Sequence, residues 1–192
     1  MKNLLLIAIT ILAVGCGGKD ESTTEIKPVE EKALEVLKNQ KCEVVLHDEN
    51  AGDIIDDSID LEVLAQGFEI AEGPLWVASK KMFLFSDVKG NKIYSWTEEA
   101  GLNTFLSPGG HTEIVPYFEG GVLGSNGLAL DLDGNLIICQ HGDRRLAKLS
   151  FDNVSQEGVS AIVEKFEGKR FNSPNDLTVA SNGDIYFTDP PY

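Results

Sequence analysis

Residues 126–141, which read NGLALDLDGNLIICQH, decide the fold class of this chain. Apolar runs at 128–130 and 136–139 lie on either side of residues 131–135, which are rich in Asp, Asn and Gly. Asp-Gly between two apolar runs is a strong β-hairpin signal, because these residues tolerate the positive φ angles of tight turns. The stretch therefore predicts two antiparallel strands joined by a short turn.

The same pattern occurs on both sides of this stretch. Residues 72–87 read EGPLWVASKKMFLFSD, and residues 175–189 read NDLTVASNGDIYFTD. Glu72 and Asn126 are 54 positions apart, and Asn126 and Asn175 are 49 apart. Further strands are expected at the remaining apolar runs, which are 61–67, 92–97, 146–151 and 161–166. A period near 50 residues with several short strands per unit is typical of β-propeller blades.

We therefore predict an all-β chain in which residues 56–192 form part of a β-propeller. A β-sandwich also contains many short strands and is the alternative, but it does not explain why the same positions recur at matching phase. Trp76 and Cys139 are expected to pack in the interior. Residues 141–145, which read HGDRR, could form a solvated turn with a salt bridge.

The first residues indicate export. The apolar run at 4–14 is eleven residues long, whereas a membrane-spanning helix needs about 20. Residues 13–16 read AVGC, which is similar to a bacterial lipobox. We predict a lipoprotein signal peptide at 1–15, a lipid anchor on Cys16, a tether at 16–55 and a lipid-anchored location in the cell envelope. An ordinary signal peptide followed by an incidental cysteine is the alternative.

The charge of the chain excludes some partners. Its net charge is −15, which repels nucleic acid phosphates and anionic membrane surfaces. Neither is expected as a partner, apart from membrane attachment through the N-terminal lipid, whereas divalent cations suit this balance. The three cysteines are too few and too far apart for a disulfide framework.

The repeat also predicts a site. The residues that start the first, innermost strand of each hairpin, Glu72, Asn126 and Asn175, are expected to crowd one rim of the propeller channel. The second strands return to the same rim and end at Asp87, His141 and Asp189. Carboxylate and amide oxygens favour a hard divalent cation such as Ca²⁺. Zinc is less favoured, because His141 is the only nitrogen ligand at this rim.

These residues lie in motifs that resemble the SMP-30/gluconolactonase/LRE-like family, and the bacterial gluconolactonases within it. The motifs are EGPLW at 72–76, FSD at 85–87, GSNGL at 124–128, HGDRR at 141–145, SPND at 173–176 and TDPPY at 188–192. The resemblance spans residues 61–192, and the order of the motifs makes it specific.

The resemblance implies a six-bladed β-propeller that hydrolyses sugar lactones with one divalent ion, and this chain would cover about its first three blades. It implies that Glu72 and Asn175 bind the ion, with Ca²⁺ expected and Zn²⁺, Mg²⁺ or Mn²⁺ as alternatives. Residues expected to contact the lactone are Asn126, His141, Arg170 and Asn172. A further Asn and an Asp, which serves as the general base, are expected after Tyr192. The protein is thus expected to be a lactonase, and this chain alone an inactive fragment.

Alternatives remain for each site residue and for the function. Glu72 could end a strand or pair with a lysine, Asn175 could stabilise its own turn, and His141 could be structural. The same scaffold could instead carry an esterase or phosphotriesterase, or a non-catalytic propeller that binds a ligand or partner at the cell surface.

Overall fold

The structure is a computed structural model that describes residues 44–54, 62–116 and 123–191. The predicted signal peptide and the predicted lipid anchor, Cys16, lie outside the described residues. The chain divides into two compact units, Met1–Gly67 and Phe68–Tyr192. In the first unit, the 3-10 helix η1 (Glu49–Asp53) begins after Asp48, whose carboxylate accepts a hydrogen bond from the Asn50 backbone N–H at 2.8 Å. The expected strand at 61–67 is wrong, because residues 62–67 lie in no strand.

Within the described residues, no helix is both long and apolar enough to cross a membrane.

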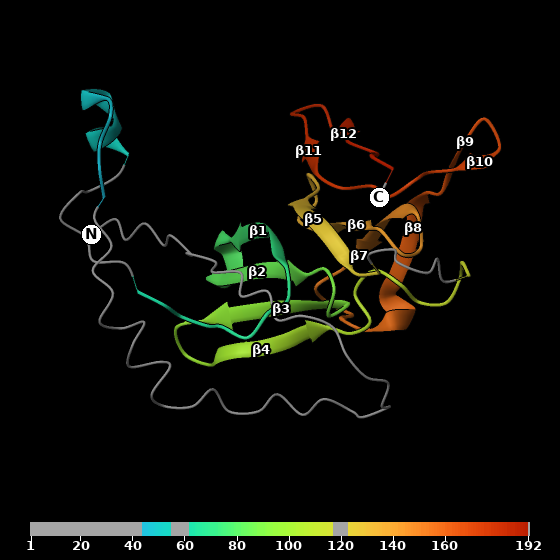
Figure 1. The fold of residues 1–192 in the computed structure, drawn as a ribbon, viewed down its shortest axis with the longest axis horizontal. Coiled ribbons are helices and arrows are strands. Elements are labelled where there is room, and N and C mark those ends of the chain that lie inside the picture. The colour runs from blue at the N-terminus through green and yellow to red at the C-terminus, as the bar shows by residue number, and fades with distance from the viewer. Residues whose placement is uncertain (1–43, 55–61, 117–122, 192) are drawn as a thin grey trace, which may run out of the picture. The chain divides into compact units, whose positions relative to one another are not determined.

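The second unit opens with a four-stranded antiparallel sheet (Figure 1). Its strands, in spatial and chain order, are β1 (Ala71–Val77), β2 (Met82–Asp87), β3 (Lys92–Thr97) and β4 (Gly101–Leu106). The turn between β1 and β2 contains η2 (Ala78–Lys80) and ends at Lys81, which has a φ of 48°. The sequence patterns predicted β1, β2 and β3, but not β4.

A second four-stranded antiparallel sheet repeats this arrangement. It consists of β5 (Ser125–Leu130), β6 (Leu136–Gln140), β7 (Arg145–Leu149) and β8 (Val159–Val163), with η3 (Gln156–Gly158) before β8. Asp131 closes the β5–β6 turn, because its Oδ1 accepts hydrogen bonds from the backbone N–H groups of Asp133 and Asn135. Gly134 in this turn has a φ of 82°, as the hairpin signal requires.

The third repeat of the sequence pattern is preceded by one short two-stranded ribbon and contains a second one. One pairs β9 (Lys165–Phe166) with β10 (Lys169–Arg170), and the other pairs β11 (Leu177–Val179) with β12 (Ile185–Phe187). The strand expected at 161–166 is therefore divided between β8 and β9. The third hairpin is confirmed at β11–β12, and the described strands confirm an all-β chain with blade-like sheets.

The core joins the two large sheets. Leu84 and Ile93 from the first sheet and Leu136 and Ile138 from the second are all fully buried and belong to one cluster. Truncation of such a side chain to Ala typically costs about 2–5 kcal/mol. Cys139 is buried as expected, but the expectation for Trp76 is wrong, because half of its surface is exposed. Glu72, Pro74 and Trp76 are exposed on β1, whereas Val77 is buried.

Candidate metal and ligand site

The residues that start the three hairpins lie next to one another in space, in chain order (Figure 1). A Cβ added at Gly73, which has a φ of +58°, would meet the backbone oxygen of Asn126 at 2.1 Å. A Cβ added at Gly127 would meet the Asn175 backbone oxygen at 2.8 Å, and the Gly127 N–H donates to that oxygen at 2.7 Å. Both glycines therefore permit close backbone contact between neighbouring repeats. This contact places Glu72, Asn126 and Asn175 along one rim, as the repeat predicted.

The side chains at this rim form a chain of contacts. Asn126 is buried, and its Nδ2 donates a hydrogen bond to Asn175 Oδ1 at 2.8 Å. His141 is 4% exposed. Burial lowers the pKa of His141 from 6.5 to about 4, while a hydrogen bond with the Asn175 side chain and the negative charge of Asp189 act in the opposite direction. At neutral pH the imidazole is therefore uncharged and lies against Asn175.

Glu72 is the exposed carboxylate of the rim. It forms no hydrogen bond or ion pair with another described residue, which leaves its oxygens available to a ligand. The backbone beside it is fixed, because its register partner Ser86 donates from Oγ to the Asn126 backbone oxygen at 2.8 Å. The lysine pair that was the alternative for Glu72 is absent from the described ion pairs.

Glu72 does not lie directly opposite Asp87, which ends the second strand of its hairpin. Glu72 faces Ser86 across the strand pair, and Asp87 faces Ala71. The cause is an irregularity between Glu72 and Leu75, where Gly73 adopts its positive φ. Asp87 is buried, and its Oδ1 accepts from the backbone N–H groups of Ile70 and Gly90 at 3.2 Å each, which is a structural role.

Arg170 and Asn172 lie on the segment that leads to Asn175. Arg170 Nη1 donates to the Asp143 backbone oxygen at 3.3 Å, and Arg144 Nε donates to the Asn172 backbone oxygen at 3.0 Å. Both residues are thus attached to the turn that begins at His141. Their predicted roles in substrate binding remain predictions.

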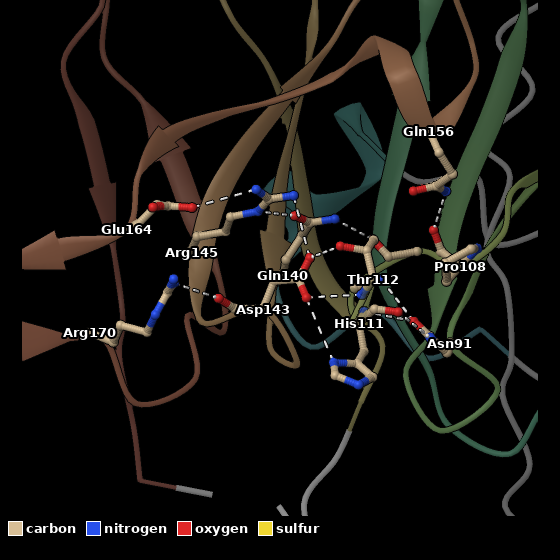
Figure 2. A network of polar contacts seen from close by, with 12 residues as sticks. Asn91, Pro108, His111, Thr112, Gln140, Asp143, Arg145, Gln156, Glu164 and Arg170 are labelled. Atoms are coloured by element: carbon tan, nitrogen blue, oxygen red, sulfur yellow. Dashed lines mark hydrogen bonds and ion pairs between the residues drawn. The ribbon is translucent and has the colours of Figure 1, made fainter. Parts of the chain in front are cut away.

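A buried polar cluster, which the sequence did not reveal, joins the loop after β4 to the turn between β6 and β7 (Figure 2). Asp143 is fully buried and accepts hydrogen bonds from the Thr112 backbone N–H at 2.9 Å and from the Thr112 hydroxyl. Arg145 Nη2 lies 3.4 Å from Asp143 Oδ2, and His111 Nδ1 lies 3.7 Å from Asp143 Oδ1. A salt bridge between Asp143 and Arg145 is therefore present in 141–145, but the alternative of a solvated turn does not hold, because both side chains are buried.

Gln140 extends this cluster to the backbone. Arg145 Nε donates to Gln140 Oε1 at 2.6 Å, and Gln140 Nε2 donates to the Gly109 backbone oxygen at 2.9 Å. Because Asp143, Arg145 and Gln140 are all buried, each polar group needs its partner. The cluster holds the His141–Arg144 turn in place beside the rim.

The donor set at the rim fits a hard divalent cation in its chemistry. Within the described residues, no group of three or more His, Cys, Asp and Glu side chains is arranged to hold a metal ion. The rim instead offers the Glu72 carboxylate and amide groups from Asn126 and Asn175, while the carboxylates of Asp87 and Asp189 accept hydrogen bonds from backbone N–H groups. Oxygen donors of this kind suit Ca²⁺ or Mg²⁺ better than zinc, which prefers nitrogen and sulfur. Cys139 does not add a thiolate, because burial and the nearby Asp176 carboxylate raise the pKa of its thiol.

The pKa of His141 predicts a dependence of stability on pH. The folded-state pKa, about 4, lies below the unfolded value of 6.5, so the unfolded state takes up the proton first as the pH falls. The stability contributed by neutral His141 is complete above about pH 6.5 and declines toward about pH 4. In metal-free buffer, the unfolding free energy should fall between about pH 7.5 and about pH 5 by about 2 kcal/mol more in the wild type than in His141→Gln. Equal losses in urea unfolding of the two proteins would contradict this shift.

Comparison with known proteins gives the same family for most of the chain. The sequence pattern described as SMP-30/Gluconolactonase/LRE-like region matches residues 70–192. A protein named gluconolactonase from Zymomonas mobilis is 42% identical over 139 residues, which cover 72% of this chain and 38% of that protein. The chain therefore spans well under half the length of this relative.

Solved structures agree. A structural-genomics target assigned to the gluconolactonases is 35% identical with a TM-score of 0.53, over 67% of this chain and 39% of that one. A gluconolactonase from Xanthomonas campestris is 32% identical with a TM-score of 0.51, over 63% of this chain and 35% of that one. With the described sheets, these matches confirm an all-β chain that covers part of a β-propeller.

Proposed function

This chain belongs to the SMP-30/gluconolactonase/LRE-like family, and on this basis we propose that the protein hydrolyses a sugar lactone with the help of a bound divalent ion. The observation that carries the proposal is the contact of Asn126 with Asn175, and of Asn175 with His141, on the rim that also bears Glu72. The 42% identity to a protein named gluconolactonase supports the choice of substrate class and of the bacterial gluconolactonase branch.

In this proposal, Glu72 and Asn175 hold the ion, and Ca²⁺ is the expected species. When bound, such an ion supplies a Lewis acid that polarises a carbonyl oxygen. Neutral His141 and Asn126 line the site beside Asn175, where they can exchange hydrogen bonds with hydroxyl groups of a ligand. The general base is assigned to none of the described residues.

A substrate panel tests the proposed reaction. The protein as its gene encodes it should hydrolyse D-glucono-1,5-lactone at least about tenfold more efficiently, in kcat/KM, than an aryl ester or a phosphotriester. A preference for the aryl ester or the phosphotriester would favour the alternative hydrolases. Binding of the lactone without turnover of any of the three would favour a non-catalytic propeller.

We further propose that the protein is a lipoprotein of the cell envelope, attached through Cys16. The supporting observation is the apolar run at 4–14 followed by AVGC at 13–16. The net charge of −15 argues against attachment to nucleic acid or to an anionic membrane surface by charge alone.

The variant Cys16→Ser tests this anchor. Because the thiol is the group that accepts the lipid, the variant should lose incorporation of labelled palmitate and leave the membrane fraction. Cys139→Ser is the matched control, because this thiol is buried in β6 and should have no effect on labelling. Palmitate labelling that persists in Cys16→Ser would contradict the proposal.

A further inference from the structure

Asp189 is the carboxylate that holds the segment ahead of Asn175. Its Oδ1 accepts hydrogen bonds from the backbone N–H groups of Asn172 at 2.9 Å and Ser173 at 2.8 Å. Its Oδ2 accepts from the same Asn172 N–H at 2.9 Å and from the Asn172 side-chain Nδ2 at 3.2 Å. That Nδ2 also donates to the Asp189 backbone oxygen, at the longer distance of 3.4 Å. Arg144 also fixes this segment, because its Nε donates to the Asn172 backbone oxygen. The backbone of Asn172 is therefore held both at its N–H and at its carbonyl oxygen.

These contacts also determine which way the Asn172 amide points. The oxygen and nitrogen of an amide are normally interchangeable in a structure, but an ionised carboxylate can only accept hydrogen bonds. Asp189 therefore requires the NH₂ group of Asn172 on its side. The remaining polar atom, Asn172 Oδ1, accepts no hydrogen bond from the described residues, and the side chain is exposed. Asn172 thus offers an acceptor to whatever occupies the site.

We infer that Asp189 is a positioning residue that makes Asn172 a hydrogen-bond acceptor, so that the site selects a ligand carrying a hydroxyl group at that point. The inference rests on the proposed function, and it names the feature of the lactone that the site recognises. Asn172 belongs to the same rim, because Arg144, which holds its backbone, closes the turn that starts at His141.

The test uses D-gluconate, the hydroxy acid that forms from D-glucono-1,5-lactone, and its mono-deoxyfluoro analogues. In each analogue a fluorine replaces one hydroxyl, which preserves size but removes the donated hydrogen bond. In calorimetric titrations of the protein as its gene encodes it, at least one analogue should bind about tenfold more weakly than gluconate.

The loss of affinity that the fluorine causes relative to gluconate is called the penalty below. In Asp189→Asn, this penalty should shrink to about threefold or less. One side-chain oxygen remains to accept from the two backbone N–H groups, but the new NH₂ group donates to Asn172 Oδ1 and turns this oxygen away from the ligand. The turn gives up only the long contact, 3.4 Å, between Asn172 Nδ2 and the Asp189 backbone oxygen. Asp152→Asn is the matched control, because Asp152 is exposed and its carboxylate has no partner among the described residues; it should keep the wild-type penalty. If Asp189→Asn does not fold, Asn172→Ala must remove the same penalty.

Three results would overturn the inference: no binding of gluconate by the wild type, equal binding of gluconate and all analogues, or a penalty that persists in Asp189→Asn.

Hydrolysis of the lactone is measured separately on the wild type. If the protein hydrolyses the lactone but binds gluconate and all fluoro analogues equally well, only the inference is contradicted. If a fluoro analogue binds more weakly but no lactone is hydrolysed, only the proposed function is contradicted.

Discussion

Glu72→Gln is expected to weaken Ca²⁺ binding about a hundredfold and to lower lactone turnover with it. At a ligand distance of about 2.4 Å, a unit negative charge attracts a doubly charged ion by about 3 kcal/mol even at the dielectric constant of water, which corresponds to about a hundredfold in affinity. Glu72 is the exposed carboxylate of the rim, and the other proposed ligand, Asn175, is neutral. Calorimetric titration of Ca²⁺ into the protein as its gene encodes it measures this effect.

Glu69→Gln is the matched control for this variant. Glu69 is exposed, lies three positions before Glu72 and loses the same charge, so general electrostatics affect both variants alike. Its Ca²⁺ affinity should stay within about threefold of the wild type. Equal affinities for wild type and Glu72→Gln would make Glu72 a structural acid.

Asp143→Ala is expected to lower the unfolding free energy by about 3–5 kcal/mol, which is the usual cost of breaking a buried ion pair. The variant leaves Arg145 buried without its nearer carboxylate, since the other ion-pair partner, Glu164, lies 3.6 Å away and is partly exposed. It also removes the acceptor of both Thr112 hydrogen bonds. Urea unfolding measures the change.

Two variants separate this cost from a general effect. Asp143→Asn keeps an acceptor for Thr112 but loses the charge beside Arg145, so its loss should be intermediate. Asp152→Ala lies on the surface and should change stability by less than about 0.5 kcal/mol. A loss in Asp143→Ala no larger than that in Asp152→Ala would contradict the role of the buried cluster.

Local sequence signals were sufficient to predict the hairpins. The β5–β6 turn forms where Asp131 and Gly134 were expected to make it, because both act within a few residues of their partners. The fourth strand of the first sheet, β4, was missed because no Asp-Gly or Asn-Gly pair precedes Gly101. Trp76 was misplaced because side chains of β1 alternate between two faces, and no local signal shows which of them is covered.

The rim was predictable because a repeat places equivalent positions side by side. The contact between Asn126 and Asn175 joins residues 49 positions apart that occupy the same phase of the pattern. The buried cluster around Asp143 has no such guide, because Thr112 lies 31 positions away in a loop outside the repeated hairpins. A buried carboxylate and an exposed one look the same in sequence, so HGDRR was equally compatible with a solvated turn.

In the proposed function, the rim bearing Glu72, Asn126, Asn175 and His141 holds a divalent ion on which lactone hydrolysis depends. The hydrolysis rate of D-glucono-1,5-lactone by the protein as its gene encodes it, before and after exhaustive dialysis against EDTA, measures this dependence. Chelation is expected to lower the enzyme-dependent rate by at least about a hundredfold, and added Ca²⁺ to restore it. An unchanged rate in protein shown by mass spectrometry to contain no divalent ion would contradict it.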